Sequence, residues 1–255
     1  CLYAYLHLQE QLPPEKLECL TIDKSFLIQD IERAVSTYKK QLETSYIPFS
    51  LFEEYLLPPV IEDEPLENWR ERCLDKFSFL NTLDVVEVCD MINSLLSKDF
   101  SFNYGEIPAR YLSWSYLDTL TKGDCYHMAK SVLYPLRALG YPCTIDFSPC
   151  WGNTTGGHSW NVVYIEGKMI PFMGREKGIY AYDPFRIYNF ENPERMNPAR
   201  YPGKVYRKTF SANKKLKQLI GHISMDDLPP FLSDCRMMDV TAEYLPVSVS
   251  YTHLR

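Results

Sequence analysis

Apolar residues recur at helical spacing through the first hundred residues of the chain. The stretch SFLIQDIERAVSTYKK predicts a helix that ends at two lysines, which suit the negative end of a helix dipole. PFSLFEEYLLPP predicts a short helix stopped by Pro58 and Pro59. EPLENWRERCLDKFSFL, from about Pro65, and LDVVEVCDMINSLLSK repeat the helical pattern. We therefore expect residues 1–104 to form a helical N-terminal region.

The pattern changes after Gly105. A helix is predicted from Cys125 to Leu139, with Gly140 as its C-terminal cap residue. CTIDF reads as a strand, and HSWNVVYI and KMIPF read as two more, joined by the two-residue hairpin turn Glu166-Gly167. This order predicts an α+β core over residues 105–210, with a helix packed on an antiparallel sheet.

The last part of the chain alternates between apolar and polar residues. KVYRKTF and DVTAEYLPVSVS both show the period of two that is typical of strands. We expect them to supply the closing strands of the core and then the start of a truncated β domain, over residues 211–255.

Composition excludes several classes of partner. The formal net charge is −6, and the 27 basic residues are scattered, so neither nucleic acid nor an anionic membrane surface is expected as a partner. No run of roughly 18 apolar residues occurs, so no membrane span is predicted. Eight cysteines in 255 residues are too sparse for a disulfide scaffold.

One cysteine stands at the predicted start of a helix, in the stretch TKGDCYHMAK. Unpaired N–H groups and the helix dipole favour a thiolate at this place, so we expect Cys125 to have a lowered pKa and to act as a nucleophile. Gly123 would let the backbone turn tightly and a substrate approach. Asp124 can cap the helix, although its charge works against the thiolate. The backbone N–H of Cys125 would contribute half of an oxyanion hole.

The base that accepts the thiol proton should be a histidine. His127 lies on the same helix as Cys125 and points away from it. His7, His222 and His253 lie near the ends or in the second domain. His158 opens a strand after the glycine pair Gly156-Gly157 and is the best candidate. The competing interpretation is that Cys125 is a core thiol and His158 an ordinary strand residue.

A zinc site is a competing hypothesis for the same residues. Several residues in this part of the chain could bind a metal, namely Cys125, His127, Cys143, Cys150 and His158. No C-x-x-C pair occurs, and the spacings fit no common zinc finger or ribbon. The sequence therefore predicts no metal and no cofactor.

The stretches KGDCYHMAKSVLYPLRALGYPCTIDF and GGHSWNVVYIEGKMIPF resemble the transglutaminase-like superfamily of papain-type cysteine enzymes, over roughly residues 105–190. More loosely, the helices ahead of this core and the aromatic-rich tail resemble transglutaminase-like proteins of gut Bacteroidetes. The resemblance implies a papain-like core, with Cys125 as nucleophile and His158 as base. It also implies an extracytoplasmic location, in the periplasm or at the cell surface, and a peptide, protein or peptidoglycan-like amide as substrate.

The resemblance fails at the third catalytic position, where the family usually has an aspartate. Counting across the hairpin turn pairs Trp160 with Met173 and His158 with Arg175, so the expected acid falls near Met173. Asp183 and Glu176 remain as acids that could fold back to His158, with Asp183 favoured. A backbone group or a water could instead orient the imidazole, or the site could lack efficient catalysis.

Two functions stay open at this point. The favoured one is acyl transfer on an amide, in which Cys125 attacks and His158 moves the proton; water as acceptor makes a peptidase or amidase, and an amine makes a crosslinking enzyme. The second is a catalytically weak or inactive module that binds a peptide or glycan in a cleft lined by aromatic residues. Trp160, on the face of His158, and Trp151, in the preceding loop, would line that cleft.

Overall fold

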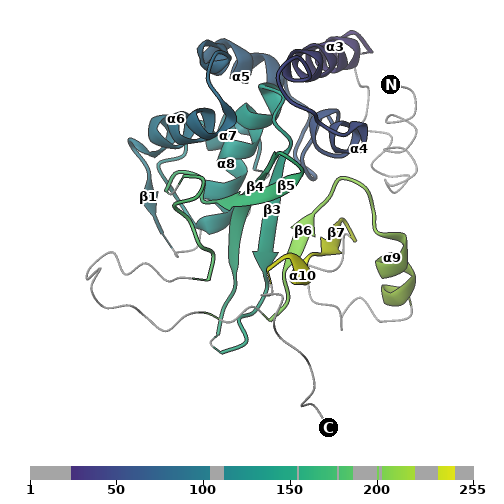
Figure 1. Cartoon of the computed structure of the whole chain (residues 1–255), viewed down its shortest axis with the longest axis vertical. Coiled ribbons are helices and arrows are strands. Elements are labelled where there is room, and N and C mark those ends of the chain that lie inside the picture. The colour runs from purple at the N-terminus through teal and green to yellow at the C-terminus, as the bar shows by residue number, and fades with distance from the viewer. Residues whose placement is uncertain are drawn as a thin grey trace.

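The computed structural model describes residues 24–103, 112–153, 155–176, 178–185, 200, 203–221 and 235–244. Its helices are α3 (Lys24–Gln41), α4 (Phe49–Leu51) with the π-helical turn Phe52–Leu56, α5 (Trp69–Phe77) with the 3₁₀ turn Ser78–Leu80, α6 (Val85–Ser97), α7 (Trp114–Leu117), α8 (Cys125–Ala138), α9 (Lys214–Ile220) and α10 (Thr241–Tyr244). Its strands are β1 (Ser101–Phe102), β2 (Lys122–Gly123), β3 (Cys143–Ser148), β4 (His158–Ile165), β5 (Lys168–Phe172), β6 (Tyr206–Lys208) and β7 (Met237–Asp239). Figure 1 shows α3, α5 and α6 gathered at one end, with β6, β7 and α9 at the other.

The helices predicted for the first hundred residues are confirmed within the described part of the chain. Asp84 caps α6 and forms a capping box with Glu87, which explains why that helix begins where it does. α5 begins at Trp69 rather than near Pro65. The residues just ahead of it are held elsewhere, since the Glu67 side chain accepts hydrogen bonds from the backbone of Ser115.

Five strands form one antiparallel sheet in the order β5-β4-β3-β6-β7. The hairpin turn between β4 and β5 is the one predicted, and both Glu166 (φ 46°) and Gly167 (φ 87°) have positive φ, as a type I′ turn requires. β7 comes from the residues predicted to begin a β domain, yet it pairs with β6 and so belongs to this sheet. Of the predicted β domain, residues 222–234 and 245–255 lie outside the described residues.

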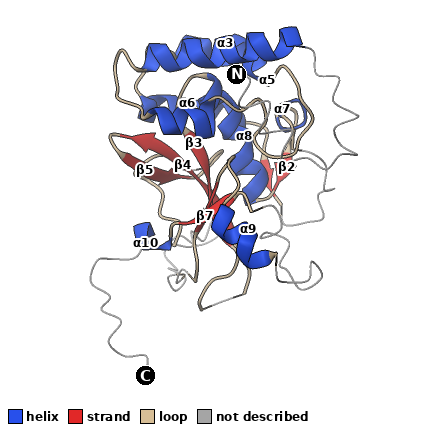
Figure 2. Ribbon diagram, turned by 90° about the vertical axis from the view of Figure 1, so that its right-hand side faces the viewer, coloured by secondary structure: helices blue, strands red, loops and turns tan. Residues whose placement is uncertain are grey.

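α8 packs against β3 and β4 on one side and against α5, α6 and α7 on the other. Figure 2 shows α6 above β3, β4 and β5, and α8 beside these strands. A single hydrophobic cluster joins these elements, with buried members such as Trp69, Phe77, Ile92, Leu133 and Val163. The α+β class and the helix packed on an antiparallel sheet are therefore confirmed. The domain boundary proposed after residue 104 stays a prediction.

A buried cation ties α8 to the segment before α5. Lys130 is 1% exposed, and its Nζ lies 2.8 Å from Glu62 and 2.9 Å from Glu64. The Tyr126 hydroxyl also donates to Glu62, and Lys208 lies 3.0 Å from the same carboxylate. We call these five residues the α8 clamp. Burial alone would oppose ionisation of Glu62, but the two lysines hold the pKa of its carboxyl well below the usual range.

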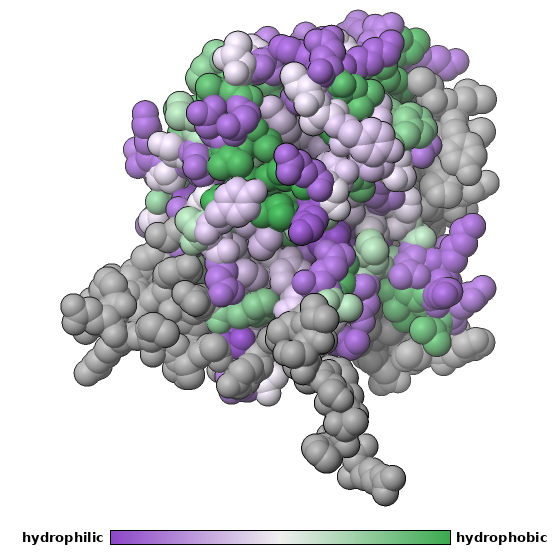
Figure 3. Space-filling view, in the orientation of Figure 1, coloured by the Kyte–Doolittle hydropathy of each residue, from purple (hydrophilic) through white to green (hydrophobic). Residues whose placement is uncertain are grey.

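The surface gives no sign of a membrane span. Among the described residues, no helix has the length and apolar character needed to cross a bilayer. On the face in Figure 3, hydrophobic residues form small groups among hydrophilic ones.

Candidate active site

Cys125 is the first residue of α8, as the sequence predicts. Asp124 caps the helix by accepting hydrogen bonds from the backbone N–H groups of Tyr126 (2.9 Å) and His127 (3.1 Å). The His127 ring turns back to the same carboxylate, with Nδ1 2.7 Å from Asp124 Oδ1. The His127 side chain is therefore bound to the capping residue, and Cys125 lies on the side of the helix that faces the sheet.

Gly123 is needed here for packing. A Cβ at this position would lie 2.7 Å from the Cβ of His127 and 3.1 Å from the ring of Phe100. A larger residue would therefore push the start of α8 out of place. The expectation that this glycine leaves room for a substrate finds no support in these contacts.

β4 brings His158 to the start of α8. His158 is the first residue of β4, and the backbone N–H of the next residue, Ser159, lies close enough to the Cys125 side chain to lower its pKa. The thiol and the first residues of β4 are thus adjacent in space, although 33 residues separate them in the sequence. The structure brings together the two residues that the sequence selected as nucleophile and base.

Two glycines shape the loop that leads into His158. Gly156 has φ +85°, a conformation that residues with a side chain rarely adopt. A Cβ on Gly157 would lie only 2.3 Å from the carbonyl oxygen of Ser148 and 2.8 Å from that of Pro149. The close approach of these two backbone segments holds the loop against β3 and delivers Trp151 and His158 to the site.

The orienting partner of His158 is a tyrosine. His158 Nε2 and the Tyr182 hydroxyl are 2.7 Å apart. Among the described residues, no carboxylate hydrogen-bonds to this imidazole. Asp183, the next residue along the chain, instead accepts a hydrogen bond from the backbone of Phe185 (3.0 Å). Asp183 and Glu176 lie close enough to raise the pKa of Tyr182 by their charge, after burial, which is the larger cause.

The β4–β5 ladder ends too early to pair Met173 with Trp160 and Arg175 with His158. The β4–β5 ladder ends at Phe172, which pairs with Asn161, so the expected pairing of His158 with Arg175 does not form. Arg175 has φ 59° and buries its guanidinium against Ser131 and three backbone carbonyls, those of Leu96, Leu117 and Leu120. Met173 is buried among the aromatic residues of the site.

The resting site favours two neutral groups. Burial raises the pKa of the Cys125 thiol and Asp124 adds to the effect, against a hydrogen bond from Ser159 that lowers it. Burial, together with the positive charge of Arg200, lowers the pKa of His158 to about 4. The expectation of a lowered thiol pKa is therefore wrong, because the loss of solvent around Cys125 outweighs the helix N-terminus.

Five aromatic side chains, which we call the aromatic cluster, surround the pair: Trp151, Trp160, Tyr182, Phe185 and Tyr244. The two indoles stack nearly parallel, with ring centroids 6.5 Å apart. The Trp160 N–H donates to the Tyr244 hydroxyl (3.0 Å), which donates to Asp146 (2.6 Å). Trp160 is 0% and Trp151 3% exposed, so the two indole rings pack against each other and not against solvent.

Sequence reasoning missed Tyr182 and Tyr244. Tyr182 directly precedes Asp183 and takes the place beside His158 for which the sequence favoured Asp183. Tyr244 comes from α10, whose place beside β4 depends on the pairing of β7 with β6. No local pattern in the sequence marks either residue.

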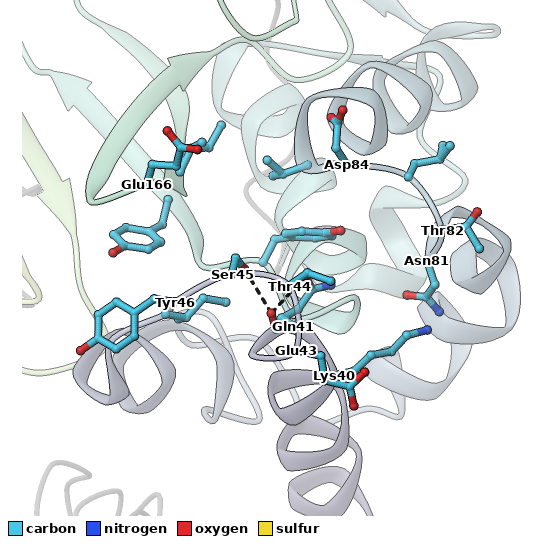
Figure 4. A pocket seen from close by; sticks show the side chains of 16 residues that line it. Lys40, Gln41, Glu43, Thr44, Ser45, Tyr46, Asn81, Thr82, Asp84 and Glu166 are labelled. Carbon is cyan, nitrogen blue, oxygen red and sulfur yellow. Dashed lines mark hydrogen bonds between the residues drawn. The ribbon is translucent and has the colours of Figure 1, made fainter.

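A separate pocket of about 450 Å³ lies at the far end of β4. Figure 4 shows its lining from the end of α3, the start of α6 and the β4–β5 turn, with Tyr46, Asp84 and Glu166 around it. β4 has eight residues, so this pocket and His158 are separated by roughly 23 Å of strand. Within the described residues, no group of three His, Cys, Asp or Glu side chains could hold a metal ion.

Comparison with known proteins gives a family match and distant structural neighbours. No curated protein matches the sequence. A candidate cysteine protease from Cytophaga hutchinsonii is 18% identical, with a TM-score of 0.36, over 43% of this chain and 37% of that one. The periplasmic domain of TgpA from Pseudomonas aeruginosa, bound to ethylmercury, is 16% identical, with a TM-score of 0.33, over 47% and 45%. This chain thus spans less than half the length of either protein.

The family match covers the centre of the site. Residues 81–174 match the model of the transglutaminase-like superfamily, and this range contains both Cys125 and His158. It begins inside the predicted helical region, at the residues that lead into α6. It ends before Tyr182 and Asp183. Over these residues, the chain is similar to the transglutaminase-like superfamily.

Proposed function

We propose that this protein catalyses cysteine-dependent acyl transfer on an amide. The observation that carries the proposal is the position of Cys125 at the start of α8, where its charge acts on Tyr182, the residue whose hydroxyl lies 2.7 Å from His158 Nε2. A thiol and an imidazole in this relation are the parts that a cysteine acyl-transfer enzyme needs. The family match supports the same chemistry.

The reaction proceeds in two halves. Cys125 Sγ attacks the amide carbonyl carbon while its proton passes to His158. The backbone N–H of Cys125 stabilises the oxyanion. The C–N bond breaks, and His158 returns the proton to the leaving amine. Water or a second amine, deprotonated by His158, then attacks the thioester and releases the acyl group and the thiol.

Tyr182 is the positioning residue in this scheme. Its hydroxyl holds one ring nitrogen of His158 and leaves the other for the thiol proton. A hydroxyl orients the ring but supplies no negative charge to stabilise the imidazolium that forms during attack. We therefore expect slower catalysis than in an enzyme with a carboxylate at this position, unless Asp183 or Glu176 moves to the imidazole.

The second candidate function is a catalytically weak or inactive module that binds a peptide or glycan. The neutral thiol and the lowered His158 pKa favour it, because both disfavour the ion pair that makes a cysteine reactive. Stacking of a sugar on Trp151 or Trp160 is not part of this candidate function as the structure stands, because both rings are buried.

Trapping of the acyl-enzyme tests the proposal. The protein is mixed with p-nitrophenyl acetate, and the modified cysteine is mapped by mass spectrometry. We expect acetylation at Cys125, lost in Cys125→Ala and strongly slowed in His158→Ala. Cys150, which is exposed, is the matched control: Cys150→Ala should leave acetylation of Cys125 unchanged. Acetylation of Cys150 alone, with Cys125 inert, would favour the binding module.

The acyl acceptor is decided by a second assay. Hydrolysis of a peptide amide and incorporation of a fluorescent primary amine into a glutamine-containing protein are measured side by side. Release of ammonia or peptide without incorporation identifies a peptidase or amidase. Incorporation identifies a crosslinking enzyme. An extracytoplasmic location remains part of the proposal and is testable by fractionation of the source cells.

A further inference from the structure

Arg200 lies over the aromatic cluster, and the described residues offer its charge no ion-pair partner. Its guanidinium carbon is 5.2 Å from the centroid of the Trp151 ring, a cation–π distance. Its backbone N–H donates to the carbonyl of Phe185 (2.9 Å), which attaches this residue to the cluster. Within the part of the chain that the structure describes, Arg200 forms no ion pair.

Two buried donors in this region also lack acceptors among the described residues. They are the Nε of Arg200 and the Nε1 of Trp151. Other indoles in the protein are satisfied: Trp69 donates to the carbonyl of Pro59 (2.7 Å) and Trp160 to the Tyr244 hydroxyl. A buried N–H without an acceptor destabilises a fold by about 1–3 kcal/mol. Such a pair of donors, one of them cationic, is suited to an anion that arrives from outside.

The unmatched donors adjoin the reacting residues. The ring of Trp151 lies 6.4 Å from that of His158, centroid to centroid. The charge of Arg200 is felt at the imidazole, where after burial it is the second cause of the lowered pKa. A group that accepts hydrogen bonds from these two donors would therefore sit next to an amide held at Cys125.

We propose that Arg200 and the indole N–H of Trp151 form a subsite for a carboxylate of the substrate, so that the acyl-transfer site selects amides with an acidic group close to the reacting bond. This inference rests on the proposed function and names its substrate class. Arginine suits the role because its planar guanidinium can meet both oxygens of a carboxylate.

Binding of the carboxylate would also change the base. The positive charge of Arg200 disfavours the imidazolium, and a bound carboxylate would cancel that charge. The pKa of His158 would rise toward its ordinary value, and proton transfer from Cys125 would become easier. An acidic substrate thus supplies part of the negative charge that a catalytic carboxylate would otherwise provide.

The indole N–H signal of Trp151 tests the subsite without any need for catalysis. The protein has four tryptophans, so ¹⁵N-correlated spectra resolve the indole signals, and Trp151→Phe assigns the one of interest. Full-length protein is titrated with N-acetylglycine, which has a terminal carboxylate, with N-acetylaspartic acid α-amide, which has a side-chain carboxylate, and with the neutral N-acetylglycinamide. We expect the Trp151 signal to shift with a carboxylate probe and to stay in place with the neutral one.

The response should depend on Arg200 and on no surface arginine. Arg200→Gln should weaken binding of the carboxylate probe at least tenfold, while Arg72→Gln, at a half-exposed surface arginine, should leave it unchanged. Which acidic probe binds more tightly decides between a chain terminus and an acidic side chain as the source. Equal response to the acidic and neutral probes, or an unmoved Trp151 signal, overturns the proposal.

Alkylation gives a second readout for the unmutated protein. Iodoacetate carries a carboxylate and iodoacetamide does not, so the ratio of their rates at Cys125, divided by the ratio at exposed Cys150, reports selection for the anion. We expect this double ratio to exceed one; a value of one or below contradicts the subsite. Selection for carboxylates without any acyl transfer would remove the proposed function and keep the subsite. Acyl transfer with no preference for acidic substrates would keep the proposed function and remove the subsite.

Discussion

Buried charges are paired with opposite charges on one side of α8, and on the other side the described residues leave a cation unpaired. On the outer side, the α8 clamp gives buried Lys130 two carboxylates, and the pKa of the lysine is raised because Glu62 and Glu64 outweigh its burial. On the side of Cys125, Arg200 has no described anion, and His158 is held by a neutral hydroxyl. Folding alone explains the first arrangement, since every charge is matched. In the second arrangement, the N–H donors of Arg200 and Trp151 have no acceptor among the described residues, as expected where a ligand completes the site.

The largest expected effect comes from breaking the clamp. Lys130→Met should lower the free energy of unfolding by about 3–5 kcal/mol, because it removes the cation that Glu62 and Glu64 share and leaves buried Glu64 without one. Denaturant unfolding measures the change. Lys204→Met is the matched control, since Lys204 and Asp239 form an exposed pair that should contribute no more than about 1 kcal/mol. Equal losses in the two variants would contradict the clamp.

The dependence of stability on pH under acidic conditions should report the protonation of His158. Its pKa of about 4 in the folded state lies below the value of about 6.5 for an unfolded chain. Between these values the unfolded state binds more protons, so stability falls as the pH drops from 6.5 to 4. The loss reaches about 3 kcal/mol. His158→Gln should remove this part of the loss; an unchanged pH dependence would mean that His158 titrates normally.

The reactivity of the Cys125 thiol should change at neutral and alkaline pH, whereas the effect of His158 on stability appears at acidic pH. Because the pKa of Cys125 is raised, the alkylation rate of Cys125 by iodoacetamide should grow about tenfold for each pH unit through neutral and mildly alkaline pH. Mass-spectrometric mapping at several pH values measures this slope. A plateau that begins below pH 7 would instead show the thiolate that the helix N-terminus alone predicts.

The smallest effect is expected at Tyr182. Tyr182→Phe removes the hydroxyl that holds His158, a hydrogen bond with a net contribution of about 1 kcal/mol. We expect stability to change by about that amount and acetylation at Cys125 to slow about tenfold, with a changed pH profile. Asp183→Asn is the comparison. If Asp183→Asn slows the reaction more than Tyr182→Phe, the acid is the orienting group and the hydroxyl is not.

Local pattern was enough to place the nucleophile and its helix. Asp124, Cys125 and Gly140 mark the start and end of α8 by capping chemistry, and the Glu166-Gly167 turn sets the β4–β5 register. These features depend on neighbours in the chain, so they can be read from it. The choice of His158 followed by the same reasoning, from a glycine-rich loop that opens a strand.

What surrounds Cys125 and His158 was decided only by the tertiary structure. The ladder that the register implied stops at Phe172, because Arg175 turns away to bind carbonyls on three other segments. The thiol pKa depends on how much water the aromatic cluster excludes, which no helix-start motif specifies. Tyr182 and Arg200 reach the site from loops far along the chain. Long-range packing, burial and unmatched charge are properties of the whole fold, and for that reason the sequence predicted the reacting atoms and not their environment.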